Sequence, residues 1–137
     1  MMKIILVAHG KLADEMKNST EMIYGNIPQC SSVNFYNNEG FDSIQNKLKN
    51  IIKHSKEPIL IMTDLFCGTP YNASCAISIE MSNRDIEIIS GMSLPLVLEA
   101  ISMSSNGLTE VVNHLVNLSS DTVKVFSQVF IEEEEEL

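Results

Sequence analysis

The sequence is poor in arginine, and this shortage removes one class of partner. Arg84 is the only arginine among 9 basic residues, which face 18 acidic ones for a net charge of -9. Nucleic-acid binding needs clustered lysine and arginine for phosphate contacts, so we expect no nucleic-acid partner. Part of the negative charge belongs to the run Glu132 to Glu136, which is typical of a solvated, disordered tail.

Cysteine pairs and long apolar runs are also missing. Cys30, Cys67 and Cys75 include no CxxC pair, which argues against a disulfide framework and against structural zinc. No run approaches the ~18 apolar residues of a membrane span, and the apolar run near the amino terminus is too short for a signal peptide. We therefore expect a cytoplasmic protein with one domain over residues 1–131 and an acidic tail over residues 132–137.

Strand and helix patterns alternate along the chain. Short apolar runs predict strands at Lys3 to Ala8, Ser32 to Tyr36, Ile59 to Thr63 and Ile86 to Ser90. Helical spacing and cap signals predict three helices at Lys11 to Tyr24, Asp42 to near His54 and Pro70 to about Met81. Two more helices are predicted to begin at the N-caps Ser93 and Thr109. This alternation predicts an α/β fold with a doubly wound, mostly parallel sheet and helices on both faces. We expect the strand order 2-1-3-4.

Two side chains with complementary chemistry follow neighbouring strands of this expected sheet. The order 2-1-3-4 places the first and third strands at the switch point, where ligands bind beyond the carboxyl ends. His9 follows the first strand and Asp64 follows the third, so we expect them to meet. A carboxylate on Nδ1 holds the imidazole in one tautomer and leaves a lone pair on Nε2. The prediction is a catalytic pair in which Asp64 orients the nucleophile His9.

The residues after Asp64 indicate a helix start beside an anion site. A turn at 66–68 precedes Thr69, a good N-cap residue, and Pro70, which fits the first helical position. Free N–H groups at a helix N-terminus bind anions, so a phosphoryl group on His9 would face this turn. Backbone donors would have to supply most of the contacts because no arginine is available. The expected phosphoryl-binding residues are Phe66, Gly68 and Thr69.

The residues alone leave other interpretations open. His9 could be a structural histidine that bonds to backbone at the end of a strand. Cys67 could be an activated thiolate beside the helix N-terminus, although a cysteine phosphatase would need an arginine in the following loop. His9, Asp64 and Cys67 could bind a metal, although their spacing is not a known zinc pattern. A further alternative is a regulatory or ligand-binding module that has this fold but does not transfer a phosphoryl group. The intact His9 and Asp64 argue against it.

Three stretches of the chain look like the signature stretches of a known family. They are Val7-Ala8-His9-Gly10, Thr63 to Asn72, and Ile89 to Pro95. They resemble the EIIA domain of the mannose family of the phosphoenolpyruvate-dependent sugar phosphotransferase system. In the order and length of its elements, the resemblance covers roughly residues 1 to 130.

The resemblance implies a phosphohistidine carrier without metal or other cofactor. Such a domain accepts a phosphoryl group from phospho-HPr and passes it to an EIIB protein, which phosphorylates the incoming sugar. His9 matches the phosphoryl acceptor, Asp64 the orienting aspartate, and Thr69 the hydroxyl residue before the proline. Membrane EIIC and EIID proteins would be indirect partners only. The same fold and histidine also serve the phosphotransferase subunit that feeds dihydroxyacetone kinase, and this alternative remains open.

The turn after Asp64 departs from the usual family pattern at one position. Cys67-Gly68 stands where family members usually show Gly-Gly; if the first position needs a positive φ, Cys67 carries strain of about 1–2 kcal/mol.

The stretch Val123 to Phe130 alternates and has apolar side chains on both faces, which predicts a last strand. Similar family members form dimers in which this strand completes the partner's sheet. We therefore expect a homodimer.

Overall fold

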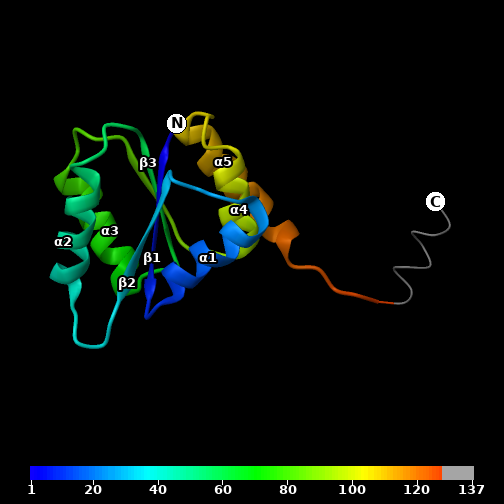
Figure 1. Cartoon of the computed structure of the whole chain (residues 1–137), viewed down its shortest axis with the longest axis horizontal. Coiled ribbons are helices and arrows are strands. Elements are labelled where there is room, and N and C mark those ends of the chain that lie inside the picture. The colour runs from blue at the N-terminus through cyan, green and yellow to red at the C-terminus, as the bar shows by residue number, and fades with distance from the viewer. Residues whose placement is uncertain (128–137) are drawn as a thin grey trace.

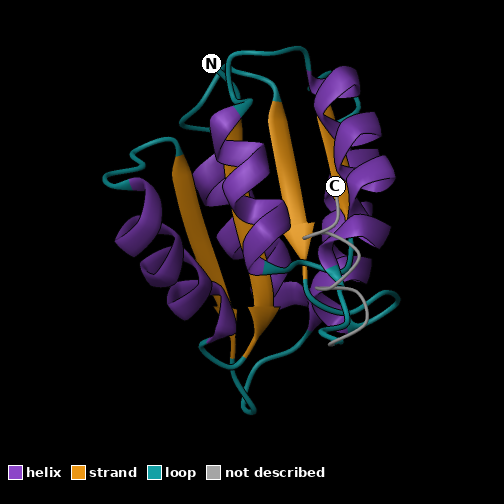
Figure 2. Ribbon diagram, turned by 90° about the vertical axis from the view of Figure 1, so that its right-hand side faces the viewer, coloured by secondary structure: helices purple, strands orange, loops and turns teal. Residues whose placement is uncertain are grey.

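A computed structural model describes residues 1–127 of the chain. Within this part, four strands form one parallel sheet in the order β2-β1-β3-β4 (Figure 2). The strands are β1 Lys3–His9, β2 Cys30–Phe35, β3 Ile59–Thr63 and β4 Ile86–Ile89. The predicted fold class and strand order are confirmed.

Helices cover both faces of the sheet (Figure 1). The helices are α1 Leu12–Tyr24, α2 Phe41–Ile52, α3 Thr69–Glu80, α4 Leu94–Ser102 and α5 Leu108–Leu118, followed by the short 3-10 helix η1 Ser119–Thr122. Figure 1 shows α2 and α3 on one face and α1, α4 and α5 on the other. Among residues 1–127, no helix is both long enough and apolar enough to cross a membrane.

The two central strands are buried on both faces. Side chains of β1 alternate between two apolar clusters, with Ile4 and Leu6 in the cluster that includes α4 and α5 residues, and Ile5 and Val7 in the cluster that includes α2 and α3 residues. A strand covered on both sides needs apolar residues at every position, which explains the continuous apolar runs. Each fully buried Ile or Leu stabilises the fold by about 1.5–3 kcal/mol. The site residues therefore stand at the ends of strands that are buried on both faces.

Three predicted helix starts are wrong by one or two residues. The sequence pattern placed these starts at Asp42, Thr69 and Thr109, whereas the observed N-caps are Gly40, Gly68 and Gly107. Each glycine has the extended φ and ψ of an N-cap residue, and glycine has no side-chain oxygen to cap the first N–H groups of the helix. In α2 the Ser43 hydroxyl instead accepts the Gly40 N–H at 3.1 Å. Ser93 is the N-cap of α4 as predicted, but its buried Oγ has no hydrogen-bond partner among the described residues.

The end of the described chain bears on the predicted last strand. Residues 123–127 follow η1 without forming a strand, and the side chains of Val123, Val125 and Phe126 are exposed. Residues 128–130 and the acidic tail lie outside the described residues. The exchange of this strand between two copies therefore stays a prediction.

Candidate functional site

His9 and Asp64 are brought together by the pairing of β1 with β3. The two strands are parallel neighbours, so their carboxyl ends reach the same edge of the sheet. Asp64 Oδ2 accepts a hydrogen bond from the His9 backbone N–H at 3.0 Å, and it lies 2.8 Å from His9 Nδ1. The contact that the sequence predicted is present, and it involves both the backbone and the side chain of His9.

The protonation of this pair follows from its surroundings. Burial alone would raise the pKa of Asp64, but hydrogen bonds from the His9 N–H, the His9 ring and the Leu65 N–H outweigh it and lower the pKa below its usual value. The ionised carboxylate can only accept hydrogen bonds, so Nδ1 of His9 carries the proton. Nε2 is left with a lone pair, and the His9 side chain is 48% exposed. The arrangement is that of an oriented, accessible nucleophile.

A tight turn places the start of α3 against the imidazole. The Gly68 N–H donates to the Leu65 carbonyl at 3.0 Å, and Cys67 has φ 64° at the third position of this turn. Positive φ at that position is the mark of a type II turn, where glycine or asparagine is usual. A Cβ atom on Gly68 would lie 3.2 Å from His9 Cε1. Glycine therefore allows the close approach of His9 to the N-terminus of α3.

The first turn of α3 offers unused hydrogen-bond donors. Its first helical bond runs from the Asn72 N–H to the Gly68 carbonyl at 2.9 Å, so the Thr69 and Tyr71 N–H groups have no acceptor within the helix, and Pro70 has no N–H. Thr69 is the first helical residue of α3. Such a helix start attracts anions. The first turn of α3 therefore presents two N–H groups without an acceptor in the helix, next to Gly68, the residue that approaches His9 Cε1.

Phe66 lies differently from the other two predicted phosphoryl-binding residues. Its side chain is 65% exposed and packs against the Tyr71 ring, with the ring centroids 5.1 Å apart. The phenyl ring offers no hydrogen-bond donor, and the role of Phe66 in phosphoryl binding stays a prediction. Other large apolar side chains are exposed in the segments that follow the carboxyl ends of β1, β2 and β3, and with Phe66 we call them the rim: Leu12, Tyr36, Phe41 and Leu65.

The cysteines differ in their surroundings. Cys30 is buried, and this burial raises the pKa of its thiol to about 11, which makes it a poor nucleophile at neutral pH. Cys67 is exposed, and its positive φ of 64° confirms the condition under which we expected strain at this position. Among residues 1–127, no three His, Cys, Asp or Glu side chains lie together as a metal site would require.

Phe35 is a neighbour of His9 that the sequence analysis missed. It is the Cα partner of His9 in the β1–β2 ladder, and the centroid of its ring lies 5.6 Å from that of His9 at an interplanar angle of 69°. The strand order was the available signal, because a parallel β2 beside β1 must bring the end of β2 next to His9. The prediction considered only the β3 side of the histidine.

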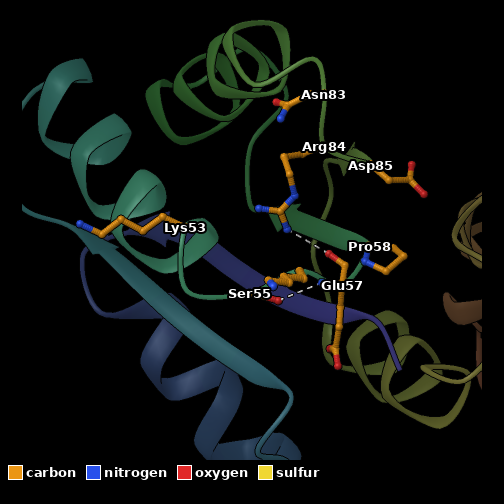
Figure 3. A pocket seen from close by; sticks show the side chains of 8 residues that line it. Lys53, Ser55, Glu57, Pro58, Asn83, Arg84 and Asp85 are labelled. Carbon is orange, nitrogen blue, oxygen red and sulfur yellow. Dashed lines mark hydrogen bonds between the residues drawn. The ribbon is translucent and has the colours of Figure 1, made fainter.

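The opposite edge of the sheet also carries a polar hollow, of about 440 Å³ (Figure 3). Arg84 donates from Nη1 to the Ile52 carbonyl at 3.0 Å and from Nη2 to the Glu57 carbonyl at 3.3 Å. The side chains of Lys53 and Asp85 point away from Arg84 in Figure 3. The arginine therefore connects two loops, and the charged groups do not converge on a common point.

Comparison with known proteins gives a consistent result. The sequence profile of the family described as "PTS system fructose IIA component" (EIIA-man) matches residues 3–117. The sorbose-specific EIIA component of Lacticaseibacillus casei is 37% identical over 122 residues, which cover 88% of this chain and 87% of that protein. The fructose-specific EIIA component of Bacillus subtilis (strain 168) is 30% identical over 131 residues, with coverage of 93% and 88%.

A solved structure agrees with these matches. The crystal structure of phosphotransferase system component EIIA from Streptococcus agalactiae has a TM-score of 0.86 at 30% identity, covering 92% of this chain and 98% of that one. The matched region contains all four strands and the edge at which His9 and Asp64 meet. This chain therefore belongs to the mannose, sorbose and fructose EIIA family, whose members are phosphotransferase proteins of the sugar phosphotransferase system.

Proposed function

We propose that this protein is a phosphohistidine carrier that accepts a phosphoryl group from phospho-HPr on Nε2 of His9 and passes it to an EIIB protein. The observation that carries the proposal is the position of the imidazole, with Asp64 on Nδ1 at 2.8 Å and the N-cap of α3 against Cε1. This arrangement combines an oriented nucleophile with an anion-binding helix start.

The transfer step needs only these groups. The Nε2 lone pair of His9 forms the N–P bond while the bond between phosphorus and the donor breaks, and the donor keeps that electron pair. Nδ1 retains its proton, so the imidazole gains positive charge, which the Asp64 carboxylate stabilises. The Thr69 hydroxyl and the N–H groups of Thr69 and Tyr71 would hold the phosphoryl oxygens. The reverse set of bond changes delivers the group to EIIB.

The rim of the site suits protein partners. Large apolar side chains, among them Leu12, Leu65 and Phe66, are exposed in the segments that follow the carboxyl ends of β1 and β3, and exposed apolar groups at one edge of the sheet favour protein–protein contacts. The names of the relatives favour a sugar pathway over the supply of dihydroxyacetone kinase. These relatives are named for two different sugars, so the sugar that this system carries is set by other components.

The phosphoryl label gives the direct test. Incubated with phosphoenolpyruvate, the general phosphotransferase enzyme and HPr, the protein should gain one phosphoryl group that is labile to acid and stable to base, as expected for a P–N bond. His9→Ala should abolish the label. A label that survives His9→Ala would show that the nucleophile is another residue.

Two other histidines supply matched controls. His114 Nε2 lies 2.8 Å from the Glu99 carboxylate, and His54 Nδ1 lies 2.6 Å from the Asn50 carbonyl. His114 thus has a carboxylate like that of His9 but does not lie against the N-terminus of α3. His114→Ala and His54→Ala should keep the label, and so should Cys67→Ala. A label lost in folded Cys67→Ala would point to the thiol as the nucleophile.

We also propose that residues 1–131 form the carrier domain, with residues 132–137 as a tail, and that two copies exchange their last strands. The outer side of β4 has no strand neighbour among the described residues, and an unpaired edge accepts a further strand. Light scattering should find a dimer for the full chain and a monomer for a chain that ends at Asp121. A full-length monomer, or a truncated chain that is still a dimer, would contradict the exchange.

A further inference from the structure

The β2 side of His9 carries an aromatic contact that the proposed transfer step does not use. Asp64 and Gly68 follow β3; the Asp64 carboxylate contacts the imidazole, and Gly68 lies so close that an added Cβ would come within 3.2 Å of Cε1. Phe35 ends β2, on the other side of β1, and its ring meets the imidazole at 5.6 Å and 69°. His9 therefore lies between groups from both neighbouring strands.

We infer that Phe35 is a positioning residue, which keeps the His9 ring in the orientation that points Nε2 at the incoming phosphorus. This inference rests on the proposed function. A single hydrogen bond from Nδ1 to Asp64 leaves the ring free to tilt about that bond. Gly68 limits the tilt in one direction, and the Phe35 ring limits it from the β2 side. Tilted rings in contact at this distance are a favourable aromatic geometry.

Phe35 is itself held firmly enough to do this. Its carbonyl accepts the Gly10 N–H at 2.7 Å, which ties the residue after His9 to the end of β2. The Lys47 ammonium donates to the carbonyl of the preceding residue, Asn34, at 2.9 Å. The Phe35 side chain also packs against the apolar cluster that includes α2 and α3 residues. These contacts hold the end of β2 and the Phe35 side chain in place, so the Phe35 ring can restrict the His9 ring that it contacts.

A positioning role differs from a packing role in the kinetic constant that it changes. Loss of the Phe35 ring should leave the affinity for the phosphoryl donor unchanged, because partner contacts on the rim remain. The bound state should react more slowly, since His9 spends less time in the reactive orientation. Aromatic contacts of this kind correspond to rate changes of about three- to tenfold.

The experiment compares Phe35→Leu, Phe35→Met and Phe35→Tyr in single-turnover phosphoryl uptake over a range of phospho-HPr concentrations. The Leu and Met variants should lower the maximal rate about three- to tenfold with an unchanged half-saturating concentration. The Tyr variant retains the ring and should restore the rate. Tyr24→Leu is the matched control, because Tyr24 is an exposed aromatic residue at the last position of α1, away from the carboxyl edge, and its maximal rate should equal that of the wild type.

Nuclear magnetic resonance of the unphosphorylated protein tests the same inference without a donor. In Phe35→Leu and Phe35→Met, the Cε1–H resonance of His9 should shift and its ring order should fall, while Nδ1 keeps its proton. Wild-type maximal rates in both folded variants would overturn the positioning role and leave the phosphohistidine carrier intact. Absence of any label on wild-type His9 would overturn the proposed function itself, whereas the resonance data would still report on the ring contact.

Discussion

The two edges of the sheet both carry polar groups, but these groups differ in whether they remain available for hydrogen bonding. At the carboxyl edge, His9 is about half exposed, and its Nε2 lone pair and the first N–H groups of α3 remain available. At the amino edge, Arg84 lines a hollow of about 440 Å³, and its guanidinium donates to two main-chain carbonyls. The presence of a hollow therefore does not mark the candidate site, whereas groups that remain available for hydrogen bonding do.

The largest effect is expected from Asp64→Asn at the carboxyl edge. The amide removes the charge that stabilises imidazolium and favours the wrong tautomer, a change that lowers the rate of a serine-protease triad by about four orders of magnitude. We expect a loss of transfer rate that approaches this size with the fold intact, measured as phosphoryl uptake and by circular dichroism. Wild-type uptake by the Asn variant would show that the His9–Asp64 contact has no part in transfer.

Gly68→Ala should have the next largest effect on transfer. The new Cβ would lie 3.2 Å from His9 Cε1 and 3.3 Å from the Leu65 carbonyl oxygen, so the imidazole must shift by a few tenths of an ångström. We expect transfer to slow by about tenfold. Gly107→Ala is the matched control, because Gly107 is also a helix N-cap and a Cβ there meets nothing within 4 Å. Equal rates for the two variants would contradict the close approach at Gly68.

Arg84→Ala tests the amino edge and should change stability alone. It leaves the Ile52 and Glu57 carbonyls without their guanidinium partner, which costs about 1–3 kcal/mol in the free energy of unfolding. Urea unfolding measures this loss, and phosphoryl uptake of the folded variant should equal that of the wild type. A variant that is stable but inactive would place part of the function at the amino edge.

Acid should weaken the protein through Asp64. The pKa of Asp64 is lower in the folded chain than its usual value, so its contribution to stability is complete above the unfolded value of about 3.9 and is lost as the pH falls through the folded value. Unfolding free energies of the wild type and Asp64→Asn should therefore converge on acidification below about pH 4. A difference that stays constant over this range would contradict the lowered pKa.

The smallest effect is expected from Cys67→Gly. Glycine adopts φ 64° without strain, which recovers about 1–2 kcal/mol, and its greater freedom in the unfolded chain offsets roughly 0.5–1 kcal/mol of this. A net gain of about 0.5–1 kcal/mol in urea unfolding is expected. Cys67→Ala keeps the Cβ and should show no such gain, so a stabilised Ala variant would assign the effect to the thiol.

The sequence was sufficient for the sheet and for the pair at its carboxyl edge. The buried runs of β1 and β3 read clearly because both faces are covered, and the order 2-1-3-4 then places His9 beside Asp64. Helix starts were less predictable, since Gly68 rather than Thr69 is the N-cap of α3. The turn from Leu65 to Gly68, with Cys67 at φ 64°, ends at this N-cap.

Phe35 was missed for a different reason. The order 2-1-3-4 places the end of β2 beside His9, but which residue stands there depends on the register of β1 with β2. Apolar patterns give the face of a strand but not the partner opposite each residue. The close approach of Gly68 to His9 was likewise invisible, because it arises from the relative position of two strand ends.

The attachment of His9 to the end of a buried central strand has a kinetic consequence. A nucleophile fixed in this way offers one nitrogen in one direction, so donor and acceptor must approach along the same line and cannot occupy the site together. Under the proposed function, transfer then follows a ping-pong sequence in which the first partner leaves before the second arrives. Initial-rate plots against the two partner concentrations should accordingly give parallel lines.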